Sequence, residues 1–184
     1  MAGHPFIVGN VRQGRYTSLE DETLALAHEI TGWLKGFVRL AVLGVGNPLR
    51  GDDAIGVEVL KRLRGKIPEN VALFECEMVP ENFLSEIERF EPSHVLMIDA
   101  AQLDLEPGEA RLIPTEKITG VALSTHTMPL SLTAEILRGN LGAEAVLLGV
   151  KPERTEFGEG LSPRLQKASK EIAAAILEAI KGAS

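Results

Sequence analysis

The sequence predicts an α/β fold: a three-layer α/β/α domain with a mostly parallel, twisted sheet of about five strands, plus an extra N-terminal helix. Short apolar segments rich in Val, Leu and Ile alternate along the 184 residues with longer segments of helical periodicity. These apolar segments carry few polar residues, as expected for parallel strands that helices bury on both faces. The length suits one ordinary domain.

The N-terminal region is predicted to hold an arm and a helix. Residues 1–17 combine glycine, proline and polar residues without periodicity, so we expect a flexible arm there and a single α/β domain over residues 18–184. From Ser18 onward, apolar residues recur at helical spacing. They predict an additional helix over residues 18–36, with Ser18 and Asp21 forming a capping box at its start.

Strands and helices then alternate through the rest of the chain. The strand segments are short, apolar and bounded by glycine or polar residues, and they cover residues 37–44, 71–79, 93–100, 108–114 and 143–150. We expect the fourth of them at an edge of the sheet. The helices follow capping, glycine and proline signals, and they cover residues 53–65, 81–90, 130–140 and, at the C-terminus, 163–182.

Composition and charge exclude several classes of function. The net charge of −7, with no visible basic patch, argues against nucleic acid or an anionic membrane as partner. No segment approaches the roughly 20 apolar residues of a membrane span, and the start of the chain does not resemble a secretory signal. Cys76 is the single cysteine, so no internal disulfide can form, and we interpret it as a small buried residue of a strand. We therefore expect a cytoplasmic protein.

Common catalytic and cofactor motifs are missing. Gly44 and Gly46 follow a strand as in a dinucleotide-binding loop, but Leu49 stands where the third glycine should be and Gly51 is out of register. The sequence contains no Walker loop, no Gly-x-Ser-x-Gly elbow and no paired-cysteine or His-Glu-x-x-His metal motif. We expect no organic cofactor.

Carboxylates lie where a parallel sheet of this kind binds ligands, at the carboxyl ends of its strands. Asp52 and Asp53 follow the first strand, and Asp99 ends the third. One aspartate suffices to cap the helix that follows, so the other is free to face the cleft. For Asp99, a turn-forming role and a functional role are equally supported at this stage.

Histidine provides the remaining candidate ligand. His126 lies in a polar loop just before a helix, where it is either structural or part of the cleft. His4 in the arm and His94 at the amino end of a strand are poor candidates. Two carboxylates and one imidazole from three loops can form an open site for zinc, nickel or a similar divalent ion. We expect one aspartate of the pair after the first strand, together with Asp99 and His126, to meet in one accessible pocket.

Four motifs in order resemble those of the nickel-iron hydrogenase maturation endopeptidases, especially the branch that serves hydrogenase 3 of formate-hydrogenlyase-type enzymes. They are GVGNPLRGDDAIGVEVL, the strand ending in MIDA, STHTMPLS and KPERTEFGEGLSP, and the similarity covers a core of about residues 37–165. The resemblance implies a phosphorylase/hydrolase-like α/β fold. It also implies that Asp53, Asp99 and His126 bind metal and act in catalysis, which leaves Asp52 for the helix cap. The helix over residues 18–36 is not explained by the resemblance.

What the resemblance implies is a hydrolase of peptide bonds that clips a C-terminal extension from the precursor of a hydrogenase large subunit. We hypothesise that nickel presented by this substrate docks against the three residues, and that either the metal, as a Lewis acid, or an activating carboxylate drives attack by water. In an alternative mechanism, Asp53 and Asp99 bind no metal and share one proton, as the paired aspartates of acid proteases do. We expect a monomer.

Other classes of function remain open. The protein could be a nickel-sensing maturation chaperone that binds the large subunit without cleaving it, or a small-molecule hydrolase or nucleotide enzyme on the same fold. Gly56 lies inside a predicted helix at a cost of about 0.5–1 kcal/mol relative to alanine, which suggests close packing or the approach of a partner backbone.

Overall fold

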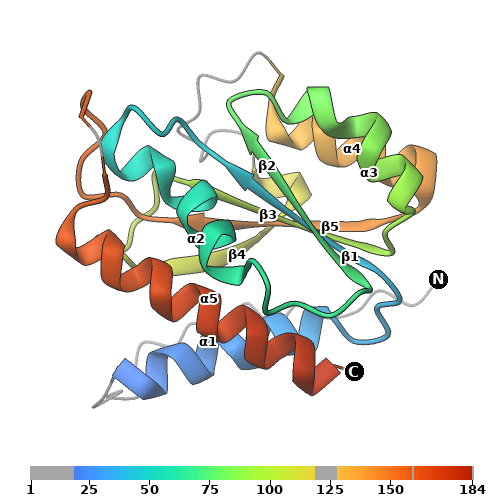
Figure 1. Cartoon of the computed structure of the whole chain (residues 1–184), viewed down its shortest axis with the longest axis horizontal. Coiled ribbons are helices and arrows are strands. Elements are labelled where there is room, and N and C mark those ends of the chain that lie inside the picture. The colour runs from blue at the N-terminus through green and yellow to red at the C-terminus, as the bar shows by residue number, and fades with distance from the viewer. Residues whose placement is uncertain (1–18, 119–127, 159, 184) are drawn as a thin grey trace.

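The computed structural model describes residues 19–118, 128–158 and 160–183, and in this part of the chain it contains a five-stranded sheet with helices on both faces (Figure 1). The strand order is β2-β1-β3-β5-β4. All neighbours pair in parallel except β4, which is antiparallel to β5 and forms an edge. The predicted fold class and the edge position of the fourth strand are confirmed.

The bounds of the elements agree with the expected segments to within a few residues. The strands are β1 (Leu40–Val45), β2 (Val71–Glu77), β3 (His94–Ala100), β4 (Ala110–Pro114) and β5 (Glu144–Val150). The helices are α1 (Leu19–Trp33), α2 (Ile55–Leu63), α3 (Leu84–Phe90), α4 (Leu130–Leu141) and α5 (Pro163–Ala183). Three short 3-10 helices are η1 (Gly51–Ala54), η2 (Pro80–Phe83) and η3 (Thr115–Lys117).

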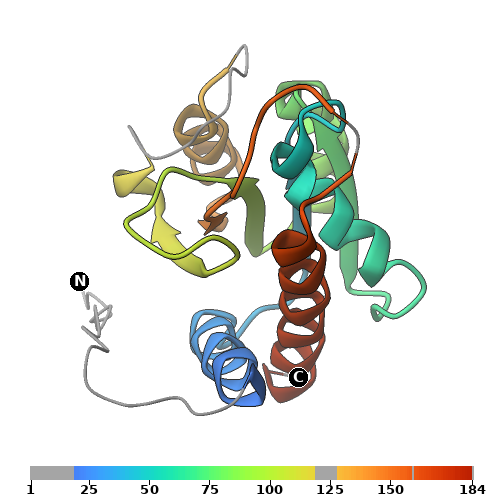
Figure 2. The ribbon, with the colours of Figure 1, turned by 90° about the vertical axis from the view of Figure 1, so that its left-hand side faces the viewer.

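The sheet separates two apolar cores, as period-two alternation of its buried strands requires. On one face, Val42 and Ile98 pack with residues of α1, α2 and α5. On the other, Leu43 and Met97 pack with residues of α3 and α4. Figures 1 and 2 show these helices as separate layers on either side of the strands.

The additional N-terminal helix exists as α1 and lies beside α5 (Figure 2). Its Ile30 side chain is fully buried and Trp33 nearly so, whereas His28 is exposed. The expected arm and Ser18 of the expected capping box lie outside the described residues. None of the helices in the described ranges is long and apolar enough to cross a membrane.

A close contact between α2 and the sheet fixes the loop after β1. A Cβ atom on Gly56 would lie 2.1 Å from the backbone oxygen of Ile98 and 2.3 Å from that of Val45, distances that real Cβ atoms do not show. The glycine therefore lets the first turn of α2 rest directly on β1 and β3, as its position inside the helix suggested. This contact holds the start of α2, and the aspartates just before it, against the carboxyl ends of these two strands.

Candidate active site

Asp53 lies at the carboxyl edge of the sheet, as expected. It belongs to η1, which runs directly into α2, so the helix that was expected to begin at the aspartates begins with a 3-10 turn. The side chain is half-buried, and its Oδ2 accepts a hydrogen bond from the backbone N–H of Asn47 at 2.9 Å. This bond ties the carboxylate to its own loop and fixes its position beside the strand end.

Asp99 is the last residue but one of β3, and its Oδ1 accepts a hydrogen bond from the backbone N–H of Ala100 at 2.9 Å. Alternation along the strand points its side chain, like those of Val95 and Met97, toward the face that α3 and α4 cover. The side chain has no exposed surface. The accessible pocket that we expected is therefore not open at this residue.

Neighbouring strands bring the two carboxylates to the same edge of the sheet. β1 and β3 pair in parallel, with Gly44 opposite Ile98, so β1 ends beside Asp99. The chain turns back from the end of β1 through η1, where Asp53 lies, and then packs on Ile98 through Gly56. The sheet therefore places Asp53 and Asp99 at two adjacent strand ends, the arrangement that the sequence predicts.

His126, the third expected ligand, lies outside the described residues. The described chain resumes at Met128, and α4 begins at Leu130, four residues after the histidine and on the face of the sheet toward which Asp99 points. Within residues 19–118, 128–158 and 160–183, no three His, Cys, Asp or Glu side chains are grouped so that they could hold a metal ion. The three-residue site stays a prediction.

Asp52 does not cap the helix, and our assignment of that role is wrong. Neither η1 nor α2 has a side-chain cap. The carboxylate of Asp52 is fully buried and accepts hydrogen bonds from the backbone N–H groups of Glu153, Arg154 and Ser162 and from the Ser162 hydroxyl, at 2.7–3.0 Å. These donors come from the loop after β5 and from the residue before α5, so Asp52 joins two loops that are distant in sequence.

Backbone hydrogen bonds continue the junction between these loops. The N–H of Gly51 donates to the oxygen of Gly158 at 2.8 Å, and the N–H of Gly158 donates to the oxygen of Leu49 at 3.0 Å. The Arg50 guanidinium donates to the Thr155 oxygen at 3.2 Å. The loop after β5 is therefore held against the loop that carries Asp53.

The Arg50 guanidinium also lies 5.7 Å from the centre of the Phe157 ring. Phe157 is 83% exposed and Leu49 is 58% exposed, so the tips of the two joined loops present apolar side chains to solvent. Neither this cation–π contact nor the junction at Asp52 was predicted from the sequence. The partners are more than 100 residues apart, and no local pattern links them.

Replacement of Asp52 by alanine is expected to lower the free energy of unfolding by about 3 kcal/mol, because buried donors lose their charged acceptor. Asp52→Asn should also destabilise, since one of its side-chain atoms would be a donor facing donors. Urea unfolding measures the loss, and amide hydrogen exchange at Glu153 and Arg154 should accelerate. The exposed Asp104→Ala variant is the control. Stability of Asp52→Ala equal to that of the control would contradict this role.

The remaining candidates behave as structural residues. His94 is buried at the amino end of β3, with its ring 5.1 Å from that of Trp33 in an edge-to-face contact, and burial lowers its pKa. Cys76 is a free, buried thiol of β2, and burial raises its pKa to about 12. A thiol with this pKa is not a nucleophile at neutral pH. His4 lies outside the described residues.

Known proteins match this chain in sequence and in structure. A sequence model of the hydrogenase maturation protease family matches residues 57–179. The Hydrogenase 3 maturation protease of Escherichia coli (strain K12) is 31% identical over 117 residues, which are 63% of this chain and 74% of that protein.

Solved structures of two maturation enzymes share the fold. The crystal structure of a [NiFe] hydrogenase maturation protease, HycI, from Thermococcus kodakarensis KOD1 has a TM-score of 0.76 and 32% identity, covering 83% of this chain and 98% of that one. The hydrogenase maturating endopeptidase HybD from E. coli has a TM-score of 0.68 and 26% identity, covering 78% and 93%.

Proposed function

The chain belongs to the hydrogenase maturation protease family, and from this premise we propose that it removes a C-terminal extension from the nickel-loaded precursor of a hydrogenase large subunit. It is a hydrolase of peptide bonds. The observation that carries the proposal is the family match on a fold that places Asp53 and Asp99 at adjacent strand ends.

Nickel in this proposal arrives as part of the substrate. Two carboxylates and an imidazole, from Asp53, Asp99 and His126, are a donor set of hard oxygen and borderline nitrogen ligands that suits a divalent transition metal. Recognition of the metal would restrict cleavage to precursors that have already received it. Burial of Asp99 means that docking of the substrate has to be accompanied by opening of the side chains that cover it.

The two carboxylates have different surroundings, which suits different roles. Asp53 is half-buried and tied to Asn47, so it is the carboxylate nearer to solvent and able to take a proton from an attacking water. Asp99 is buried at the strand end and held by Ala100. We assign Asp99 to positioning of the substrate's nickel. Asp53 would both bind that nickel and take part in proton transfer.

The decisive experiment mixes the protein with the nickel-loaded precursor and, separately, with the nickel-free precursor. We expect a shortened large subunit and a released peptide with the loaded form alone, detected by mass spectrometry. Tight binding of an intact precursor would instead support the chaperone hypothesis and overturn the proposal. Chelator added to the reaction should inhibit cleavage if the metal is required. It should have no effect if a metal-free pair of aspartates activates the water.

We also propose that the protein works as a monomer in the cytoplasm. The chain forms a complete sheet with an antiparallel edge strand and two covered faces, so the described fold needs no second copy to bury its core. The single cysteine is buried and free, which suits a reducing compartment.

A further inference from the structure

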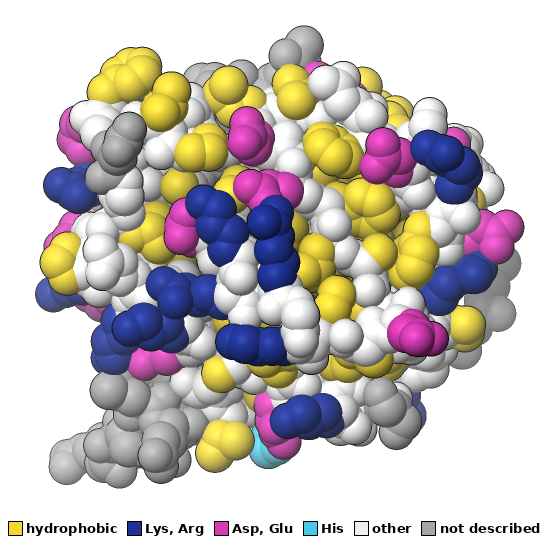
Figure 3. Space-filling view, in the orientation of Figure 1, with side chains coloured by type: hydrophobic (Ala, Val, Ile, Leu, Met, Phe, Trp, Pro, Cys, Tyr) yellow, Lys and Arg dark blue, Asp and Glu magenta, His cyan; other side chains and the backbone are white. Residues whose placement is uncertain are grey.

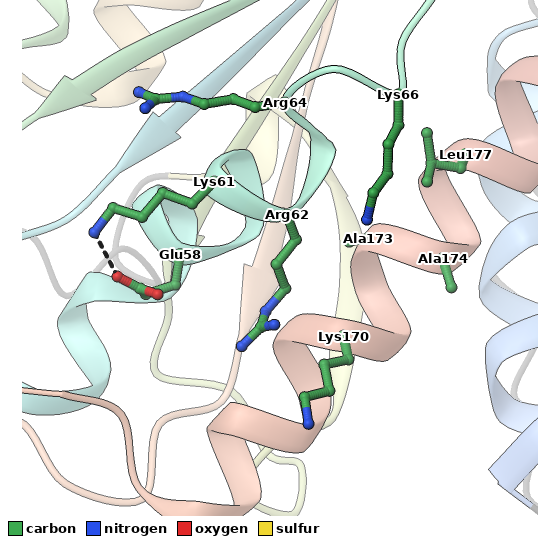
Figure 4. A pocket seen from close by; sticks show the side chains of 9 residues that line it. All are labelled: Glu58, Lys61, Arg62, Arg64, Lys66, Lys170, Ala173, Ala174 and Leu177. Atoms are coloured by element: carbon green, nitrogen blue, oxygen red, sulfur yellow. Dashed lines mark hydrogen bonds and ion pairs between the residues drawn. The ribbon is translucent and has the colours of Figure 1, made fainter.

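A basic hollow lies away from the candidate active site, between the C-terminal half of α2, the turn after it and the middle of α5 (Figure 4). Its volume is about 490 Å³. Five cations line it, and they are Lys61, Arg62, Arg64, Lys66 and Lys170. Four of these cations lie in the segment KRLRGK, residues 61–66, and α5 adds Lys170, so the protein carries a basic patch although its net charge is −7 and our expectation of none was wrong.

The carboxylates nearby neutralise only part of this charge. Glu58 pairs with Lys61 at 2.7 Å, and Glu75 of β2 pairs with Arg64. The side chains of Lys66 and Lys170 have no hydrogen bond or ion pair with any described residue. Five cations and two carboxylates leave three positive charges, and Figure 3 shows Lys and Arg side chains gathered over this part of the surface.

Stability of the fold does not account for the cluster. Cations in the last turn of α2 complement its helix dipole, which explains Lys61 and Arg62. It does not explain Lys66, which lies beyond the helix, or Lys170, which lies within α5. Figure 4 shows Arg62 and Lys66 reaching from α2 and its turn toward α5, where Lys170 lies. Gathering like charges in this way opposes folding.

We propose that this basic hollow binds an acidic segment of the same precursor, as a docking site separate from the catalytic residues; the inference rests on the proposed function. An acidic partner would be repelled by most of this acidic surface and attracted here, so charge complementarity selects the position. The hollow adds an apolar floor formed by Ala173, Ala174 and Leu177, which suits a polypeptide that alternates acidic and apolar side chains.

Smaller and larger anions fit less well. A compact phosphate group favours helix N-termini with their free N–H groups, whereas α2 presents its C-terminal end here. A duplex is bound through about 6–10 phosphate contacts spread along its backbone, more than the charge of this hollow can neutralise. In an extended acidic polypeptide the carboxylates are spaced along the chain, so each can pair with a different lysine or arginine of the hollow.

The hollow is close enough to the active site for one bound substrate to contact both. From Asp53 to Arg62 the chain runs nine residues along η1 and α2, about 13 Å at a helical rise. A protein interface of standard size buries about 800 Å² on each partner, which corresponds to a patch about 30 Å across. One precursor seated over the active site can therefore reach the hollow.

The test measures cleavage rates of the nickel-loaded precursor at increasing concentrations with the variant Lys66→Glu/Lys170→Glu. We expect KM to rise about tenfold, equivalent to about 1.4 kcal/mol, with kcat within about twofold, because reversed charges weaken docking without touching the chemistry. The KM of the unaltered protein should increase with salt more steeply than that of the variant. The control Lys35→Glu/Arg89→Glu makes the same charge change at two exposed positions, Lys35 after α1 and Arg89 on α3. The KM of this control should not change.

Each other outcome overturns the inference in a distinguishable way. If the unaltered protein cleaves and the variant keeps its KM, the docking site is wrong and the proposed function stands. If the unaltered protein does not cleave, both fail. If inorganic phosphate or a short oligonucleotide protects the unaltered protein against thermal unfolding, but not the variant, while KM is the same for both, the hollow serves that anion instead. Thermal unfolding also checks that the variant is folded.

Discussion

Replacement of Asp99 by asparagine or alanine is expected to abolish processing of the precursor while the fold is retained. Asparagine keeps the volume of the buried side chain and an oxygen that can accept from Ala100, but it removes the negative charge. A neutral amide is a much weaker ligand for a divalent ion, so the substrate's nickel would lose one of its docking groups. We expect the cleavage rate to fall about 10²-fold or more, the loss typical when a reacting group is no longer held in position.

The measurement is release of the C-terminal peptide from the nickel-loaded precursor, with circular dichroism and thermal unfolding as checks on the fold. Asp104→Ala, an exposed aspartate five residues further along the chain, is the matched control and should process normally. The Asp99 variants should still bind the precursor through the basic hollow. Processing by Asp99→Asn at the rate of the control would remove Asp99 from the site.

The fold could be predicted from the sequence because each of its elements carries a local signal. The apolar runs that became β1, β3 and β5 read as strands buried on both faces, and the structure confirms them. Their order in the sheet carries no such signal, since it depends on packing between segments distant in sequence. The same holds for α1, whose periodicity predicts a helix but not its partner, α5.

In the candidate site, too, local features could be predicted and contacts between distant segments could not. The positions of Asp53 and Asp99 at one edge of the sheet could be predicted, because Asp53 follows β1 and Asp99 lies near the carboxyl end of β3. The role of Asp52 could not, because a carboxylate at a helix start has a common local explanation, capping, and its actual donors lie 101–110 residues away. The basic hollow is a different case, because four of its cations form the visible segment KRLRGK and only Lys170 is added by the packing of α5.

Gly56→Ala is expected to lower the free energy of unfolding by about 3 kcal/mol or more. Its Cβ would meet backbone oxygens of Ile98 and Val45, which belong to central strands and cannot turn aside as a flexible side chain could. Overpacking against an interior that cannot relax costs about 1–3 kcal/mol and occasionally more. The better helix propensity of alanine, worth at most about 1 kcal/mol, opposes this loss without cancelling it.

Gly139→Ala provides the matched control, because Gly139 lies inside α4 and a Cβ there has no atom within 4 Å. That variant should gain up to about 1 kcal/mol, so the two glycines are expected to respond with opposite signs in urea unfolding. Similar responses would show that α2 can retreat from the sheet at little cost. If Gly56→Ala folds at low temperature, the same clash should move α2, and Asp53 with it, away from β3, so cleavage should fall more steeply than the folded fraction does.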